Sequence, residues 1–104
     1  MSLRHDALTD ELFRSIMALS SVEECYRYFE DLCTNKEVRD FGQRLEVARM
    51  LACGGSYQQV SEATGVSSAT VGRVKRCLEY GAGGYRMILA RLGEGKGDER
   101  PVRG

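Results

Sequence analysis

Apolar residues recur at spacings of three and four positions along most of the chain before residue 93, with charged residues between them. This period is typical of amphipathic helices, in which one apolar face packs on a core. The single proline, Pro101, follows all of these segments, so no helix-breaking residue interrupts them. The pattern therefore predicts an all-α fold of about six helices.

Three helices are predicted in the first half of the chain. Thr9 is a suitable N-cap for a first helix that ends near Ser20. Ser21 and Glu24 form a capping-box pattern that should open a second helix, and Asn35 can cap a third. The apolar stripes of these helices comprise Leu12, Phe13, Ile16, Met17 and Leu19 in the first, Val22, Cys25, Tyr26, Phe29, Leu32 and Cys33 in the second, and Val38, Phe41, Leu45, Ala48 and Leu51 in the third.

Glycines and serines delimit the shorter helices of the second half. Gly54 and Gly55 should end the third helix, because glycine accepts the left-handed C-terminal conformation without steric cost. Ser56 and Gln59 repeat the capping-box pattern and open a helix that must end by Gly65. Two further helices are expected after this glycine. The first is capped by Ser67 or Ser68 and runs to Gly81. The second is a short helix at about 85–92, with an apolar side formed by Tyr85, Ile88, Leu89 and Leu92.

The composition fits a single globular domain, because 42% of the 104 residues are hydrophobic and 29% are charged. We expect a flexible N-terminal arm at residues 1–8, a helical domain at 9–92 and a disordered tail at 93–104, which has almost no apolar surface to bury. No segment approaches the roughly 18 apolar residues of a membrane span, and residues 1–10 lack the apolar core of a signal peptide. The protein is therefore expected to be cytoplasmic and to have no membrane partner.

Cysteine spacing does not favour a metal site. Cys25, Cys33, Cys53 and Cys77 are separated by 8, 20 and 24 residues without a CxxC pair, and His5 is the only histidine. We therefore expect no bound metal. Because each cysteine falls in a helical apolar stripe, all four are predicted to be small buried hydrophobic residues of a reducing compartment.

Charge is unevenly distributed along a chain whose formal net charge is zero. Residues 6–31 contain seven acidic residues and two basic ones, whereas residues 65–78 contain Arg73, Lys75 and Arg76 with no acidic residue. A short helix therefore carries a local positive face, which is a feature of nucleic-acid binding.

The same region has the steric pattern of a helix-turn-helix at about residues 57–80. Such a motif packs two short helices across a tight turn, so apolar residues must occupy particular offsets around a turning glycine. If Gly65 is that glycine, the small Ser61 lies where the two helices cross. The inward positions then fall on Val60, Val66, Val71 and Val74.

The remaining positions of the second helix are suited to contact DNA. Serines and a helix N-terminus can hold a phosphate, small residues can enter the major groove, and arginines can bind phosphate or guanine. The predicted DNA-binding residues are Ser67, Ser68, Ala69, Thr70, Gly72, Arg73, Lys75 and Arg76.

The sequence QRLEVARMLACGGSYQQVSEATGVSSATVGRVKRCLEYG, from Gln43 to Gly81, resembles the Trp repressor superfamily, in particular its YerC/YecD-like branch. The preceding EECYRYFEDLC, from Glu23 to Cys33, also fits that branch, and the resemblance covers nearly all of residues 7–92. It implies an intertwined homodimer with two recognition helices for successive major grooves, and half-sites roughly 34 Å apart. The implied function is sequence-specific binding of double-stranded DNA by a transcriptional regulator, a repressor.

The resemblance also points to a candidate ligand site. In the Trp repressor two arginines flank a bound tryptophan, and the motif matches place Arg44 and Arg73 at those positions. The residue after Arg73 is glycine in the tryptophan-binding repressor but Val74 here, an inward position in the pattern above. We therefore expect DNA binding without a tryptophan corepressor or other cofactor. Arg44 can instead pair with Glu37, Asp40 or Glu46 on its own helix.

Two alternatives remain beside this interpretation. The protein could be a ligand-gated repressor that binds tryptophan or another small molecule near Arg44 and Arg73. It could instead be an acidic helical protein-interaction module that uses the arginines for docking. An enzyme is not expected, because the sequence has no Ser-His-Asp, paired-carboxylate or phosphate-loop pattern.

Overall fold

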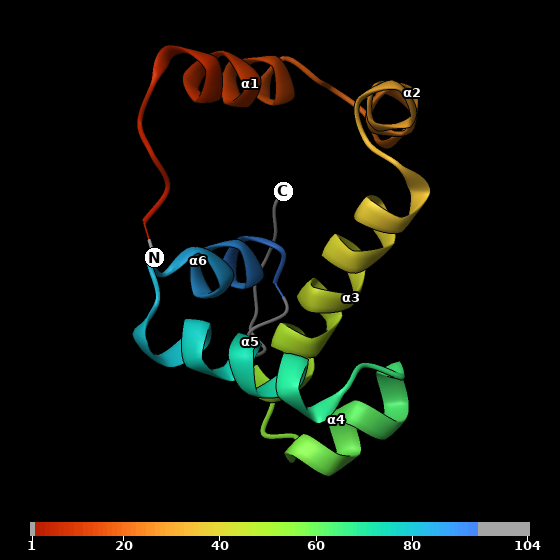
Figure 1. Cartoon of the computed structure of the whole chain (residues 1–104), viewed down its shortest axis with the longest axis vertical. Helices are drawn as coiled ribbons and strands as arrows, with labels where there is room; N and C mark the ends of the chain where they lie inside the picture. Colours follow the sequence, from red (N-terminus) through yellow and green to blue (C-terminus); the bar gives the residue numbers. More distant parts are fainter. Residues whose placement is uncertain (1, 94–104) are drawn as a thin grey trace. The chain divides into compact units, whose positions relative to one another are not determined.

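The computed structural model describes residues 2–93, which form six helices and no strand (Figure 1). The helices are α1 (Ala7–Met17), α2 (Val22–Leu32), α3 (Asn35–Ala52), α4 (Tyr57–Thr64), α5 (Ser68–Tyr80) and α6 (Gly84–Arg91). The all-α prediction is thus confirmed, while the tail predicted at 93–104 lies, except for its first residue, outside the described part. Within residues 2–93, no helix combines the length and the apolar character that crossing a membrane requires.

The chain divides into two compact units, the first ending at Val38 and the second beginning at Arg39. In the first unit, Asp6 caps α1 by accepting a hydrogen bond from the Thr9 backbone N–H at 2.8 Å. The prediction that Thr9 is the N-cap was therefore wrong, because the helix already includes two residues that had been given to the flexible arm. Aspartate is also a favoured N-cap, and its carboxylate accepts from the N–H three residues further on.

The helices α2 and α3 also begin with side-chain caps. Ser21 caps α2 as predicted, but the Glu24 carboxylate bonds to Ser20 rather than closing the box on Ser21. At the start of α3, Thr34 and Glu37 form the reciprocal capping box, with backbone-to-side-chain distances of 2.8 and 3.1 Å. Asn35 is consequently the first residue of the helix and not its cap, which corrects the sequence prediction.

The core of the second unit is built from one face each of α3, α4, α5 and α6 (Figure 1). It contains Val47, Ala48, Leu51, Val60, Val71, Val74, Leu78 and Leu89, all at most 6% exposed. Three of the four predicted inward valines belong to it, and Val66 packs against it while partly buried. The predicted stripe of α3 is correct only towards its C-terminus, since Val38 and Phe41 are exposed and the unpredicted Val47 is fully buried.

Tight glycine turns connect the three helices around α4. At the end of α3, the N–H groups of Gly54 and Gly55 bond to the carbonyls of Leu51 and Met50 at 3.0 Å, an arrangement typical of a Schellman motif. The turn between α4 and α5 depends on Gly65, whose φ of 77° lies in the left-handed region. Both glycine terminations were predicted.

Side-chain hydroxyls close the turn between α4 and α5. The Ser61 hydroxyl donates to the Val66 carbonyl at 2.6 Å, and the Gly65 N–H bonds to the Ser61 carbonyl at 2.8 Å. Thr64 accepts a hydrogen bond from the Val66 N–H through its hydroxyl at 3.2 Å. The small residue predicted at position 61 therefore also closes the turn through its own hydrogen bonds.

The four cysteines correct another expectation. Cys25, Cys53 and Cys77 are exposed and Cys33 is half-buried, so none is the buried residue that the apolar stripes predicted. For Cys25 the reason is that α2 contains no buried residue. Cys77 lies on α5 but off the face that carries the core residues Val74 and Leu78.

Gly65→Ala should lower the free energy of unfolding by about 1–2 kcal/mol, the usual cost of a left-handed conformation for a residue with a Cβ. No atom lies within 4 Å of the added Cβ, so the effect is conformational and not a clash. Gly72→Ala is the matched control, because it sits inside α5 and should stabilise by about 0.5–1 kcal/mol. Urea unfolding at one fixed protein concentration measures both, and equal effects of the two substitutions would contradict this account.

Candidate nucleic-acid interface

The N-terminus of α5 is a polar end with free backbone donors. Ser67 caps the helix by accepting a hydrogen bond from the Thr70 N–H at 3.2 Å, and the two hydroxyls also bond at 3.2 Å. The N–H groups of Ser68 and Ala69 precede the first intrahelical hydrogen bonds and so remain available to an anion. Ser68 and Ala69 are exposed, whereas Thr70 is half-buried and engaged in the cap.

Two arginines project from the same helix. Arg73 and Arg76 are exposed, and within residues 2–93 neither forms an ion pair or a hydrogen bond. They flank the buried Val74, so the helix holds one face in the core while the other carries free cations. Lys75 differs, because its ammonium lies 3.5 Å from the Glu79 carboxylate and its charge is partly compensated.

Gly72 lies beneath the aromatic ring of Tyr57, a residue that was not among the predicted site residues. A Cβ built on Gly72 would lie 3.5 Å from Cε2 of Tyr57, the first residue of α4. Gly72 is therefore partly covered by a neighbouring helix instead of being open to a groove. A sequence signal was present, because an isolated glycine inside a helix can have a packing reason.

The two arginines of the candidate ligand site make different contacts. The Arg44 Nε donates to the Asp40 carbonyl at 3.4 Å, and its guanidinium lies 5.3 Å from the centre of the Phe41 ring. Both partners belong to α3. Arg73 projects from α5, and Val74 beside it is 2% exposed within the core.

Tyr85 connects α6 to this part of the second unit. Burial raises the pKa of its phenol above 10.0, while the positive charge of Arg44 lowers it and Cys77 raises it. The phenol is neutral at physiological pH, and its partial burial further disfavours the charged form, which loses more hydration than the neutral one. The α6 helix is further tied to α5 by a hydrogen bond of 3.1 Å from Arg86 Nε to the Leu78 carbonyl.

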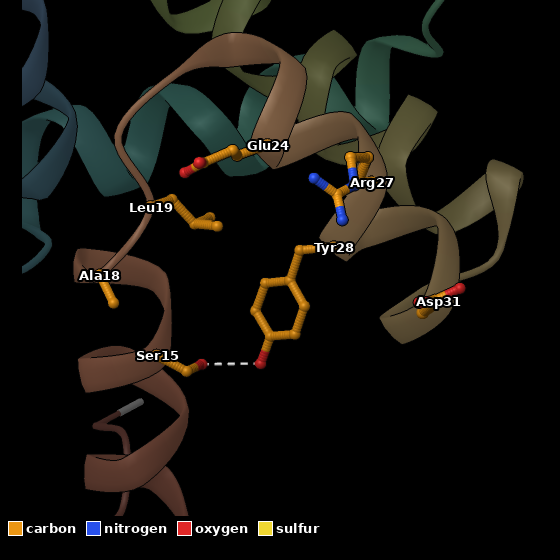
Figure 2. Close-up of a pocket in the computed structure, with 7 residues that line it drawn as sticks. All are labelled: Ser15, Ala18, Leu19, Glu24, Arg27, Tyr28 and Asp31. Atoms are coloured by element: carbon orange, nitrogen blue, oxygen red, sulfur yellow. Dashed lines mark hydrogen bonds between the residues drawn. The ribbon is translucent and has the colours of Figure 1, made fainter.

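A separate hollow lies between α1 and α2 in the first unit (Figure 2). It has a volume of about 470 Å³ and is lined by Ser15, Ala18, Leu19, Glu24, Arg27, Tyr28 and Asp31. The hydroxyls of Ser15 and Tyr28 bond at 2.7 Å across it. Hydrogen bonds from the Ser20 backbone and hydroxyl lower the pKa of Glu24, which is thus ionised and held as a helix cap.

The arrangement of α4, Gly65 and α5 defines a helix-turn-helix, within an all-helical fold that has close relatives. The Trp repressor protein family profile matches residues 7–93. YerC of Bacillus subtilis strain 168, named as an uncharacterized protein, is 54% identical over 85 residues, which is 82% of either chain.

Two solved structures share the fold at 44% identity. One, from Staphylococcus aureus, carries a provisional assignment as a Trp repressor; it has a TM-score of 0.83, with 86% of this chain and 90% of that chain covered. The other is a TrpR-like protein from Eubacterium eligens ATCC 27750, with a TM-score of 0.78 and coverages of 81% and 87%. The chain belongs to the Trp repressor family.

The raised pKa of Tyr85 predicts a loss of stability in alkali. Burial favours the neutral phenol in the folded state. Its contribution to the free energy of unfolding is therefore complete below the pKa of the unfolded state, and it disappears as the pH rises above 10.0 through the pKa of the folded state. Tyr85→Phe should make the unfolding free energy less dependent on pH in that range. Urea unfolding at neutral and alkaline pH measures the difference, with Tyr80→Phe, which alters an 83% exposed residue, as the control. Identical alkaline losses in all three proteins would contradict the assignment.

Proposed function

We propose that the protein binds double-stranded DNA sequence-specifically as a transcriptional regulator, with α5 as its recognition helix. The observation that carries this proposal is the division of α5 into a buried face and an exposed cationic one. Val71 and Val74 are at most 2% exposed, and Arg73 and Arg76 are free of intramolecular partners in the described chain. A helix held in this way can enter a groove without rearranging its core.

The chemistry of the exposed face favours DNA over other anionic partners. Backbone N–H groups at Ser68 and Ala69 can hold a phosphate, which positions the helix. Guanidinium groups can bind phosphates or pair in a bidentate manner with guanine in the major groove. Together with the family membership, these features support DNA binding through Ser67, Ser68, Ala69, Thr70, Arg73, Lys75 and Arg76. Gly72 belongs to the same helix but is partly covered by Tyr57, so it is not proposed as a direct contact.

We further propose that the functional unit is a homodimer. No residue of α1 or α2 is buried in the single chain, and Leu8, Met17 and Val22 are at least 69% exposed. Covering these side chains with a second copy would remove apolar surface from water, a strongly favourable process. Two α5 helices in a symmetric dimer would contact half-sites about 34 Å apart. A repressor acting on chromosomal DNA would work in the cytoplasm.

The protein should act without a tryptophan corepressor. Val74 is 2% exposed and packs with the other core residues, so its side chain occupies volume beside Arg73 that a ligand would need. Arg44 already contacts Asp40 and Phe41 on its own helix. These contacts support a recognition helix whose position does not depend on a small molecule.

Arg73→Ala and Arg76→Ala should each weaken DNA binding, because each removes a cation that contacts phosphate or guanine. The loss should be about 5- to 150-fold if the arginine reads a base, and the salt dependence should decrease by about one charge if it contacts a phosphate. Gel shifts with operator fragments selected from a genomic library, repeated at several salt concentrations, measure both. Helical content and dimerisation should be unchanged. Absent or salt-insensitive binding by the unsubstituted protein would instead favour a protein-interaction module.

Isothermal titration calorimetry should detect no micromolar binding of tryptophan, because Val74 fills the required space. The apparent affinity for the selected operator should also be the same with and without added tryptophan. Micromolar binding, or an operator affinity that rises with tryptophan, would support a ligand-gated repressor and overturn the proposal of corepressor-independent binding.

A further inference from the structure

Tyr57 and Gly72 form a contact between α4 and the middle of α5. A Cβ on Gly72 would meet the tyrosine ring at 3.5 Å from Cε2 and 3.9 Å from Oη. The ring edge that bears the hydroxyl therefore lies directly over the backbone of α5. Both distances are ordinary van der Waals separations, so the ring packs beside Gly72 and an alanine at this position would touch it without a clash.

The phenol of Tyr57 remains accessible on its other side. The residue is 45% exposed, and within residues 2–93 its hydroxyl forms no hydrogen bond. A tyrosine hydroxyl usually finds a hydrogen-bond partner when it becomes buried, and tyrosines are enriched at interfaces for this reason. The free hydroxyl is thus a donor held in place by packing but without an acceptor in its own chain.

The charges near this contact favour an anionic acceptor. Gly72 immediately precedes Arg73 and lies one helical turn before Arg76, both of which carry free cations. The acidic residue of α5 is Glu79, near its C-terminus, and it is paired with Lys75 at 3.5 Å. An anion approaching the middle of α5 from this side would therefore meet two guanidinium groups and a phenol donor.

We propose that the Tyr57 hydroxyl donates a hydrogen bond to a DNA backbone phosphate beside the half-site, taking the place of a side chain that α5 lacks at position 72. This inference rests on the proposed DNA-binding function. A phosphate is the expected acceptor because the first helix of a helix-turn-helix crosses the sugar-phosphate backbone while the second enters the groove. The contact would position α5 without reading a base.

An uncharged donor to phosphate has its own experimental signature. Its removal weakens binding to different sequences alike, because the phosphate is common to all of them. It leaves the salt dependence unchanged, because no counterion-releasing charge is lost. An arginine that contacts phosphate instead reduces the salt dependence when it is removed, and a side chain that reads a base changes the sequence preference.

The test compares Tyr57→Phe with Tyr80→Phe and Arg73→Ala in the full chain. Tyr57→Phe keeps the ring on Gly72 and removes only the hydroxyl, and Tyr80 is an 83% exposed tyrosine at the end of α5. Fluorescence anisotropy at several salt concentrations would be recorded on the selected operator and on a scrambled duplex, and circular dichroism would check helical content.

Tyr57→Phe should weaken binding to both duplexes by about tenfold or more, since tenfold is the lower end of the range for a hydrogen bond to a charged group. It should leave the salt slope unaltered. Tyr80→Phe should match the unsubstituted protein. Unchanged affinity of Tyr57→Phe, with Arg73→Ala still impaired, would overturn the Tyr57 contact and leave the proposed function intact. A change confined to the operator would assign Tyr57 to a base and overturn the phosphate contact. Absence of DNA binding by the unsubstituted protein would overturn both proposals.

Discussion

The packing of valines around the turn between α4 and α5 is the interaction on which the candidate site depends. Val60 brings the first helix of the motif into the core, and Val71 and Val74 do the same for the second. Gly65 allows the chain to turn sharply between them, and Ser61 closes the turn by bonding to the Val66 carbonyl. Because this packing fixes which face of α5 points into the core, it also fixes which side chains of α5 point outward.

Local signals were sufficient to predict most of the second unit. The glycines after α3 and α4 were placed correctly because a left-handed C-terminus leaves few alternatives to glycine. The inward valines could be found because the steric demands of a helix-turn-helix extend over only a few residues. Such features need no knowledge of distant partners, so the sequence pattern is enough to find them.

The errors have a common physical origin in contacts that periodicity does not contain. The caps of α1 and α3 were each displaced, by three residues and by one, because more than one residue near each helix start has a side chain that can act as a cap. Val47 was missed because α3 packs in the second unit through a face rotated from the predicted stripe. Tyr57 escaped notice because its role depends on a glycine on another helix. In each case the outcome depends on a contacting residue that the spacing of apolar positions does not identify.

The two faces of α5 also bear on how such a protein can diverge. Its thirteen residues combine buried anchors with exposed positions at Ser68, Ala69, Arg73 and Arg76. Substitutions at exposed sites usually change stability little, whereas changes of volume among packed side chains destabilise a core. Descendants of this chain could therefore acquire new operator preferences by altering a handful of outer side chains, while the scaffold that holds the helix is inherited intact.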